Sequence, residues 1–421
     1  MWMLAAVYFL LFVCLAWKNF RSAVFLFILL LPSYLIRFEV FYFRKIVFPS
    51  TVLELSFGAL FLVWLIKYSR EDIKKIITAS KKHVWFFIVF DLFFLSSVIS
   101  IFVSDMPIPS LGEWRAYFLE PMIFFLILVG RQISIYNLNS ALAISTLSIS
   151  LYAVAQKFTG WGIATPEWVA ESTRRVTAFY SSPNAVGLYL APVAMILLFI
   201  IYKMRGNRNR NFWLASMICL LSLAALIFTK SQGAWIGLGA GLLVFLFFIG
   251  YKKIVAGLAI AGVIFSLAAP SMRQAVLFQD QANQNRLRLW GYSWTFLKQS
   301  PNNFVLGTGV RQFFRKVQKP YYDKMIMERL IYPHNIFLNF WTEIGLLGML
   351  AAVIILGYAF YLSNKIRQAD KIMGAGLMAA LTVLVVHGLV DVPYFKNDLA
   401  FLFWILIASV FIIEMSERNS Q

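Results

Sequence analysis

The sequence is poor in charged residues and cysteine. Only 14% of its 421 residues are Asp, Glu, Lys or Arg, well below the quarter or so that is usual in soluble domains. Its two cysteines, Cys14 and Cys219, both lie in apolar runs, so the sequence offers neither a disulfide framework nor a cysteine metal cluster. Gly-x-Gly-x-x-Gly and Walker-type loops are also absent, so nothing indicates nucleotide binding or ATP-driven transport.

Long apolar runs take the place of charge. The chain is 61% hydrophobic with a mean hydropathy of +0.75, and the runs are continuous and close to the ~20 residues that a spanning helix needs. A β-barrel would instead show short alternating segments. The sequence therefore predicts an all-α polytopic membrane protein with about 12–13 transmembrane helices. The expected spans are 4–17, 23–36, 51–66, 84–103, 117–130, 138–156, 185–202, 212–229, 234–250, 254–269, 335–362, 374–390 and 399–413.

The Lys and Arg residues between these spans predict the orientation of the chain. Segments 67–82, 203–210 and 365–371 are the most basic short loops, which makes them cytoplasmic. Alternation then places loops 104–116, 157–184, 270–333 and 391–398 outside, although the basic residues near Arg37 fit this scheme less well. Because the cations are divided among loops, a nucleic-acid partner is a poor explanation of the net charge of +19.

The external segment 270–333 is the longest interruption and is strongly basic. It carries ten Lys or Arg against three acidic residues, about +7 in total. Such a surplus on the outer face indicates an anionic ligand or phospholipid headgroups. The spacing of Leu287, Trp290, Trp294 and Leu297 predicts one face of a helix lying on the membrane surface. Turns are expected at 300–303 and at 307–309.

The stretch 331–348 combines polar residues with an apolar helix. Pro333 suits the first helical turn, which would put His334 in that turn as well. The positive end of a helix disfavours imidazolium, so His334 is expected to be neutral and able to act as a general base. Asn335, Asn339 and Thr342 or Glu343 then form one polar stripe at membrane depth, which suggests a site. The alternative is a helix cap followed by a packed core stripe.

A second loop, 174–184, enters an apolar helix in a similar way. Ser182 is the expected N-cap and Pro183 the first helical residue, so free N–H groups lie beside Arg174 and Arg175. This combination suits a phosphate group. The alternative is a capped helix whose arginines meet lipid headgroups.

Two further arginines, Arg286 and Arg288, lie on the same side of the membrane and favour a diphosphate ligand. Because no external Asp-x-Asp or comparable carboxylate cluster exists, a divalent metal on that diphosphate has no obvious ligands. Arginines and helix ends would therefore neutralise it. No cofactor is expected.

A third external site lies at 387–393. His387 and Asp391 are four residues apart and would face one another on a helix. A structural pair that holds the helix end is the favoured interpretation of these two residues, and a functional pair is the alternative.

Taken together, these motifs resemble the O-antigen ligase and O-antigen polymerase superfamily, bacterial membrane glycosyltransferases that use undecaprenyl-pyrophosphate-linked glycans. The resemblance covers roughly 174–391, and its specificity comes from the ordered combination. The residues that carry it are Arg175 to Asn184 with the pattern Arg-x-x-x-Phe-x-x-x-Pro-Asn, Arg286-x-x-x-Trp290, Pro301, Gly307-x-Gly309, Pro333-His334-Asn335 and Glu343-x-Gly345-x-x-Gly348.

The resemblance implies a division of the chain and a set of roles. Residues 1–156 would be N-terminal transmembrane helices, 157–413 the catalytic membrane region with loop 270–333, and 414–421 a cytoplasmic tail. His334 matches the essential histidine of the family, and Arg175 and Arg286 match its essential arginines, with Arg174 and Arg288 as adjacent alternatives. Supporting residues are expected to be Asn335, Asn184, Glu343, Asp391 and His387.

The implied reaction is metal-independent transfer of a glycan from undecaprenyl pyrophosphate to an acceptor hydroxyl, at the outer face of the cytoplasmic membrane. The acceptor is a glycan, lipid or protein for a ligase and another lipid-linked glycan for a polymerase, and the Pro-His-Asn and paired arginine motifs favour the ligase. A flippase or other transporter is a weaker alternative because no halves repeat and the candidate residues cluster at one face. A non-catalytic scaffold would leave a histidine and a glutamate at membrane depth unexplained.

Overall fold

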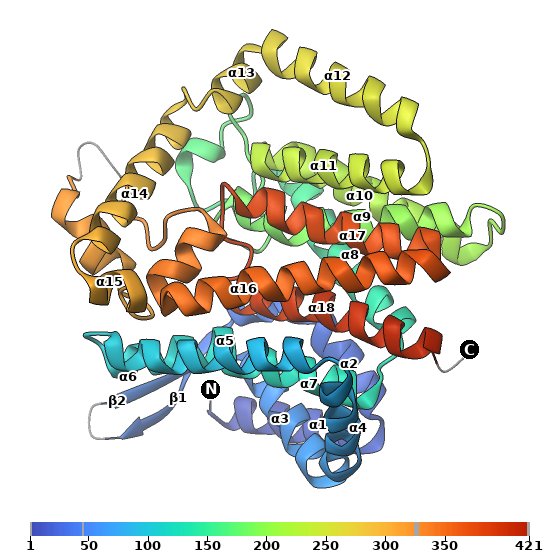
Figure 1. Cartoon of the computed structure of the whole chain (residues 1–421), viewed down its shortest axis with the longest axis vertical. Helices are drawn as coiled ribbons and strands as arrows, with labels where there is room; N and C mark the ends of the chain where they lie inside the picture. Colours follow the sequence, from blue (N-terminus) through green and yellow to red (C-terminus); the bar gives the residue numbers. More distant parts are fainter. Residues whose placement is uncertain (1, 44–45, 324–327, 419–421) are drawn as a thin grey trace. The chain divides into compact units, whose positions relative to one another are not determined.

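The computed structural model describes residues 2–43, 46–323 and 328–418 of the chain (Figure 1). Apart from one two-stranded hairpin, the regular elements of these residues are helices, so the predicted all-α membrane fold is confirmed. The chain forms two compact units, each built from segments that are distant in sequence. Unit 1 consists of Met1–Val84, Arg115–Lys230 and Tyr394–Gln421, and unit 2 of Trp85–Trp114 and Ser231–Pro393.

The elements of each unit follow the chain in the order labelled in Figure 1. Unit 1 holds α1 (Trp2–Lys18), α2 (Phe20–Leu29), η1 (Leu31–Leu35), β1 (Arg37–Phe43), β2 (Ile46–Thr51), α3 (Val52–Lys67), α4 (Ser69–Lys82), η2 (Arg115–Leu119), α7 (Glu120–Arg131), α8 (Ile135–Thr159), η3 (Pro166–Trp168), α9 (Pro183–Met204), α10 (Arg210–Thr229) and α18 (Asn397–Arg418). Unit 2 holds α5 (Val84–Val103), α6 (Pro107–Trp114), α11 (Gln232–Ile249), α12 (Lys252–Ala268), α13 (Pro270–Val276), α14 (Gln281–Lys298), α15 (Pro301–Leu306), η4 (Phe313–Gln318), η5 (Lys319–Tyr321), α16 (Ile336–Ala369) and α17 (Lys371–Gly388).

Eight of the described helices are long and apolar enough to cross a membrane: α5, α8, α9, α10, α11, α16, α17 and α18. A ninth span results if α3 and α4, which meet at a bend of 91°, are counted together. The apolar runs predict twelve to thirteen spans, and the remaining four form the shorter helices α1, α2, α7 and α12. The 12 residues of α7 rise only about 18 Å, less than the ~30 Å of a hydrocarbon core.

The core of unit 1 forms around α18, which is buried along most of its length. The ring of Phe401 lies 4.9 Å from that of Phe27 in α2 and 5.6 Å from that of Phe124 in α7. Further along α18 the indole N–H of Trp404 donates to the Tyr394 hydroxyl at 3.2 Å. A helix that is apolar on nearly all sides can pack against other helices around its whole circumference, which suits its place in the interior.

The segments Arg37–Phe43 and Ile46–Thr51, from a loop expected to be external, form the antiparallel strands β1 and β2, in which Arg37 pairs with Thr51. Thr51 then begins α3. Its hydroxyl accepts the backbone N–H of Glu54, and the Glu54 carboxylate accepts the backbone N–H of Thr51, so two unpaired donors of the first turn are satisfied together.

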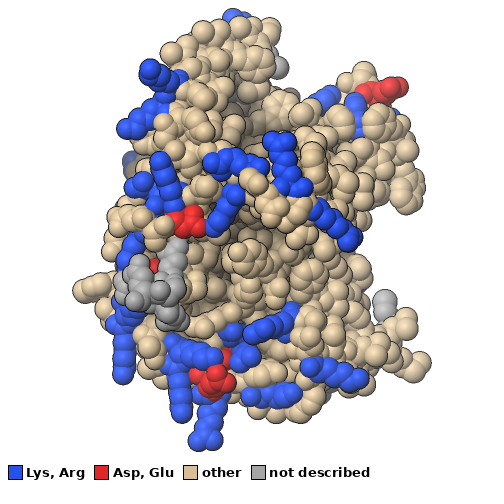
Figure 2. Space-filling model, turned by 90° about the vertical axis from the view of Figure 1, so that its right-hand side faces the viewer, with Lys and Arg blue, Asp and Glu red and all other residues tan. Residues whose placement is uncertain are grey.

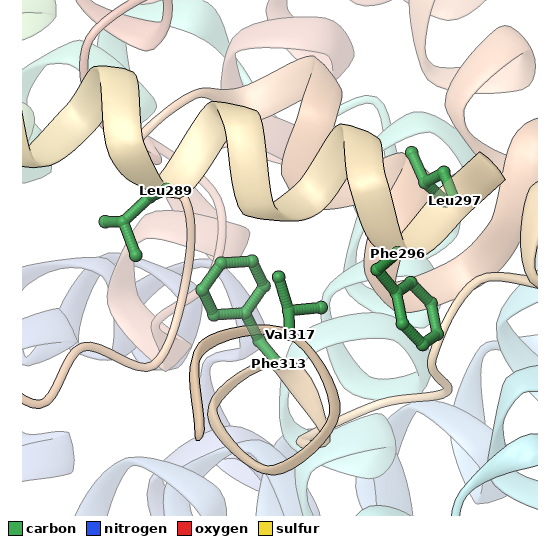
Figure 3. Close-up of a cluster of buried hydrophobic side chains, with 5 residues drawn as sticks. All are labelled: Leu289, Phe296, Leu297, Phe313 and Val317. Atoms are coloured by element: carbon green, nitrogen blue, oxygen red, sulfur yellow. The ribbon is translucent and has the colours of Figure 1, made fainter. Parts of the chain in front are cut away.

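In unit 2 the basic loop is folded, as expected, and α14 packs on η4 (Figure 3). Leu289, Phe296 and Leu297 of α14 meet Phe313 and Val317 of η4 in a buried cluster. At roughly 25 cal/mol per Å² of apolar surface, burial of five such side chains is enough to anchor a segment of this size. The cluster fixes the part of the loop that carries Arg286.

The helix expected from the spacing of Leu287, Trp290, Trp294 and Leu297 is present as α14. Leu287 and Trp294 are 41% and 43% exposed, and the contact of this face with the membrane surface stays a prediction. The buried positions are Leu289, Ser293 and Phe296, again three and four residues apart but rotated around the helix, because η4 covers that side.

The turn expected at 300–303 is also wrong. Ser300 caps α15 by accepting the backbone N–H of Asn303, and Pro301 is the first residue of that helix. Ser followed by Pro is a helix start as well as a turn signal, and the apolar residues Phe304 to Leu306 decide in favour of the helix.

Basic side chains predominate over acidic ones on the face drawn in Figure 2, in keeping with 38 Lys and Arg against 19 Asp and Glu in the chain. Such a surface attracts anions and the headgroups of acidic lipids.

Candidate functional site

The loop that carries His334 ends later along the chain than predicted. The structure begins α16 at Ile336 with Asn335 as its N-cap, so Pro333 is not the first helical residue and His334 does not lie in the first turn. The side-chain oxygen Oδ1 of Asn335 accepts the backbone N–H groups of Phe337 and Leu338, at 3.1 and 3.0 Å. A capping side chain that satisfies two donors outweighs the preference of proline for the first turn.

Asn335 also ties this helix start to the end of α17, because its amide donates to the backbone carbonyl of Leu389 at 3.0 Å. His334 has a φ of 53°, a left-handed conformation that is uncommon for residues with a side chain. Strained backbone of this kind concentrates at functional sites, since the surrounding contacts must stabilise it.

The ring of His334 faces a buried carboxylate. Its Nδ1 lies 3.1 Å from Oδ1 of Asp391, whose side chain is 5% exposed, whereas that of His334 is 18% exposed. The same Oδ1 accepts the backbone N–H of Val392 at 2.9 Å. A carboxylate beside Nδ1 favours the tautomer with hydrogen on that nitrogen, which leaves Nε2 as the proton acceptor.

The charge of Asp391 is maintained by its neighbours. Burial by itself raises the pKa of this carboxyl, but the charge and hydrogen bond of the facing His334, together with the charges of His387 and Arg286, lower the pKa by more. The pKa of Asp391 therefore lies below its ordinary value, and the side chain is an anion at neutral pH.

The prediction that His387 and Asp391 face one another on one helix is wrong, because α17 ends at Gly388 and Asp391 lies in the following turn. His387 is nevertheless close enough to Asp391 for an electrostatic interaction. The partner that the sequence did not reveal is His334, 57 residues away. No spacing rule links positions so distant, so only the folded chain could identify the pair.

Two aromatic residues position the loop. The indole N–H of Trp290 in α14 donates to the backbone carbonyl of Pro333 at 2.9 Å. The ring of Tyr332 meets that of His334 edge to face, with centroids 5.5 Å apart. In the sequence Trp290 belongs to a motif and to a predicted helix face, and its role as an anchor for the histidine loop comes from the structure.

The two arginines of α14 differ in their surroundings. Arg286 is half-buried, and its Nη1 donates to Oδ1 of Asn283 at 2.6 Å, while the Asn283 amide donates to Asp280, the N-cap of α14. Its charge acts on Asp391, so it lies in the same group as His334 and His387. Arg288 is exposed. The structure thus brings Arg286, and not Arg288, to the histidine–aspartate pair.

In unit 1 the helix start predicted at Ser182 and Pro183 is confirmed, since the Ser182 hydroxyl accepts the N–H of Asn184 and Pro183 is the first residue of α9. Arg175 donates from Nη2 to Oδ1 of Asn184 at 3.3 Å and from Nε to the Thr229 carbonyl at 3.0 Å. Its guanidinium also lies over the Trp168 ring, 5.6 Å from the centroid.

Arg174 points to other groups. It donates from Nε to the carbonyl of Val169 at 2.8 Å and from Nη1 to that of Lys157 at 2.9 Å. Both acceptors are backbone oxygens of the surrounding loop and helix end. Arg174 therefore holds the loop together, whereas Arg175 is the arginine that contacts the start of α9.

The helix that follows His334 is broken at Gly345, whose φ of 78° and ψ of 175° interrupt α16. The interruption leaves backbone carbonyls unpaired, and Thr308 satisfies one of them. Its N–H and hydroxyl both donate to the carbonyl of Thr342, at 2.6 and 2.9 Å. Glu343 accepts the backbone N–H of Arg311 at 2.7 Å. The Gly307-Thr308-Gly309 bend therefore supplies hydrogen-bond donors to the backbone at the break in α16.

The predicted polar stripe is only partly continuous. Asn339 and Thr342 are fully buried, and the Thr342 hydroxyl donates to the Asn339 carbonyl at 3.2 Å. Asn335, by contrast, belongs to the cap and Glu343 to the break. Among the described residues, no three His, Cys, Asp or Glu side chains are grouped so as to hold a metal ion.

Gly309 provides a test of this arrangement. Its φ is 83°, and a Cβ there would lie 2.6 Å from the backbone N of Ser104 and 2.7 Å from the carbonyl oxygen of Ser100. We expect Gly309→Ala to destabilise the protein by about 2 kcal/mol or more, from left-handed backbone strain and the clash with α5. The melting temperature in detergent, followed by tryptophan fluorescence, measures the loss.

Gly291→Ala is the matched control, because it lies within α14 and a Cβ there meets nothing within 4 Å. Alanine is the better helix former, so this variant should be neutral or more stable by up to about 1 kcal/mol. Equal melting temperatures for the two variants would contradict the close packing of the 307–309 bend.

The family model described as O-Antigen ligase matches residues 217–353. The matched stretch includes Arg286, Arg288, His334, Asn335 and Glu343. No curated protein matches this chain. The similarity of this membrane protein to the O-antigen ligase and polymerase superfamily is thus confirmed over residues 217–353.

Proposed function

We propose that this protein transfers a glycan from undecaprenyl pyrophosphate to an acceptor hydroxyl, at the outer face of the cytoplasmic membrane. The observation that carries the proposal is the pairing of His334 Nδ1 with the buried carboxylate of Asp391, 3.1 Å apart. This pairing orients the ring and leaves Nε2 as a base. The match to an O-antigen ligase model over residues 217–353 supports the choice of substrates.

The reaction is a displacement at the anomeric carbon of the donor sugar. The acceptor oxygen forms a bond to this carbon while its proton passes to Nε2 of His334. The bond between the carbon and the diphosphate oxygen breaks, and its electron pair leaves with undecaprenyl pyrophosphate. The proton on His334 is stabilised by Asp391. In-line attack inverts the anomeric centre.

Negative charge accumulates on the leaving diphosphate, and fixed cations lower the energy of that transition state. Arg286 and Arg175 are proposed for this role. Arg286 is supported by its place beside the His334–Asp391 pair. Arg175 is supported by its contact with the N-terminus of α9, where free N–H groups add further positive potential.

A transporter is the competing interpretation, since broken helices often form transporter binding sites. The break in α16 supports this interpretation less well, because Thr308 already donates to the freed carbonyl of Thr342. Substrate or ion contacts at that carbonyl would require the 307–309 bend to leave.

The proposal is tested by incubation of the purified protein with a lipid-linked glycan and an acceptor, with release of undecaprenyl pyrophosphate measured. We expect release together with glycan transfer, at the same rate in EDTA, because arginines and not a metal neutralise the diphosphate. Loss of transfer in EDTA would reject metal independence. Absence of release with every acceptor would reject the transferase itself.

The choice of acceptor is tested in the same assay. A ligase needs a core sugar, lipid or protein acceptor, whereas a polymerase lengthens chains when lipid-linked repeats are the only substrate. Our proposal is the ligase, so lipid-linked repeats alone should not be joined into longer chains. Chain growth from repeats alone would assign the polymerase activity instead.

A further inference from the structure

The surroundings of Asp391 contain polar atoms that the proposed mechanism does not use. His387, the last histidine of the chain, is 2% exposed and its Nδ1 has no hydrogen-bond partner among the described residues. The same holds for Oδ2 of Asp391 and for Nε of Arg286, both of which are buried. These atoms come from α17, from the turn after it and from α14.

The three groups interact electrostatically: the charges of Arg286 and Asp391 both act on His387, which precedes Asp391 by four residues, and that of Arg286 acts on Asp391. They are also chemically complementary. Nε–H of arginine is a donor, a carboxylate oxygen is an acceptor and an imidazole nitrogen is either. A small group that both donates and accepts would satisfy all three, and one buried water molecule typically makes about three such bonds.

The position of the His387 ring is set by α11. A Cβ at Gly233 would lie 2.8 Å from Cδ2 of His387, and one at Gly237 would lie 3.2 Å from its Cβ. Glycine at both positions lets the ring lie against the backbone of α11. The charged groups that act on the ring are Asp391 and Arg286, with His334 beyond Asp391, and α11 meets the ring at Gly233 and Gly237.

We propose that His387 is a positioning residue which, together with Arg286 and through a shared water molecule, holds the Asp391 carboxylate in place against His334. The inference rests on the proposed function, since a fixed carboxylate has value only if His334 acts as a base. His387 acts through Asp391 and does not touch the substrate. Its loss lets the carboxylate turn away and removes the stabilisation of protonated His334.

The chain has only three histidines, and His83 and His387 are buried, so diethyl pyrocarbonate reports on His334 without any substrate. The reagent modifies neutral imidazole. The rate of modification of the His334 peptide is measured by mass spectrometry over a range of pH. The pH at which this rate is half of its maximum is the midpoint for the His334 ring. Asp391→Asn should lower the midpoint, because protonated His334 loses its carboxylate.

We expect His387→Leu to lower this midpoint by about half a pH unit or more. At a pH below the midpoint, the rate of His334 modification should then rise about threefold. His387→Asn, which keeps a polar atom near the position of Nδ1, should restore most of the shift. In an Asp391→Asn background, His387→Leu should produce no further change, because both variants act on the same carboxylate. A purely structural role for His387 would not follow this pattern.

A second variant displaces the ring without removing it. Gly233→Ala places a methyl group against the ring and should also lower the midpoint, whereas Gly239→Ala in the same helix meets nothing within 4 Å and should leave it unchanged. The proposal would be overturned if His387→Leu and Gly233→Ala had the same midpoint as the original protein. An equal shift in the Asp391→Asn background, or no recovery in His387→Asn, would also overturn it.

The readout separates this inference from the proposed function. If the midpoint shifts as expected but purified protein transfers no glycan, the positioning of Asp391 stands and the transferase proposal fails. If transfer occurs but the midpoint does not shift, the transferase stands and the role of His387 is rejected.

Discussion

Replacement of His334 by alanine is expected to abolish glycan transfer while the protein stays folded in the membrane. The variant removes the proposed base, whose ring Asp391 orients, and general bases contribute about 10²–10⁴ in rate. The side chain is partly exposed and lies in a loop, so its removal leaves the helix packing unchanged. Transfer by purified protein and the amount of protein in membranes are the two measurements.

His83→Gln is the matched control, since His83 is a buried histidine in α4's terminal turn and has no part in the proposed reaction. It should retain transfer. Transfer in His334→Ala at the rate of the original protein would reject the base assignment, whereas loss in both variants would point to a general effect on folding.

The pH dependence of transfer adds a second test of the same assignment. Because the pKa of Asp391 is lowered, its carboxylate stays charged from about pH 5 to pH 8, the range in which histidines usually titrate. The base must be neutral to accept a proton, so the rate should rise with pH over this range. A rate that falls as pH rises would require His334 to act as an acid.

Replacement of Arg286 by alanine should lower the transfer rate by about 10²–10³, the loss seen when one donor to a developing negative charge is removed. The loss should appear in kcat more than in KM, because the diphosphate gains charge only as the bond breaks. Arg286 also supports the charge of Asp391, so the variant affects both the leaving group and the base.

Arg288→Ala is the matched control for this variant. It lies two residues further along α14, carries the same charge and is exposed. The transfer rate of Arg288→Ala should stay within a few fold of that of the original protein, because the charge of an exposed arginine is screened by water and salt. Equal losses in the two variants would show that overall basic charge, and not the position of Arg286, is what the reaction requires.

Much of the fold could be predicted because it depends on local composition. Continuous apolar runs require helices in a membrane, since every backbone N–H and C=O must be paired within the chain. The start of α9 at Ser182 and Pro183 was predicted for the same reason, because a cap and a first-turn proline act within four residues. The choice of Pro333-His334-Asn335 as a site also followed from residues adjacent in sequence.

Local rules failed where two of them competed. Proline at 333 favours an earlier helix start, but Asn335 caps the helix instead because its amide also reaches Leu389. Ser300 and Pro301 match a turn as well as a helix start, but Phe304 accepts the indole N–H of Trp341 in α16 through its backbone carbonyl, and the segment is helical. In each case a contact with a distant segment decides between alternatives that are locally similar in energy.

The sequence by itself determined that this is a helical membrane protein whose polar residues gather in a few loops, and it predicts His334 as the base. Only the tertiary structure decided that His334 faces Asp391, that Arg286 and not Arg288 joins them, and that Thr308 closes the break at Gly345. The reason is physical: composition and periodicity act over a few residues, whereas a hydrogen bond between residues 57 apart forms only when packed helices bring their ends together.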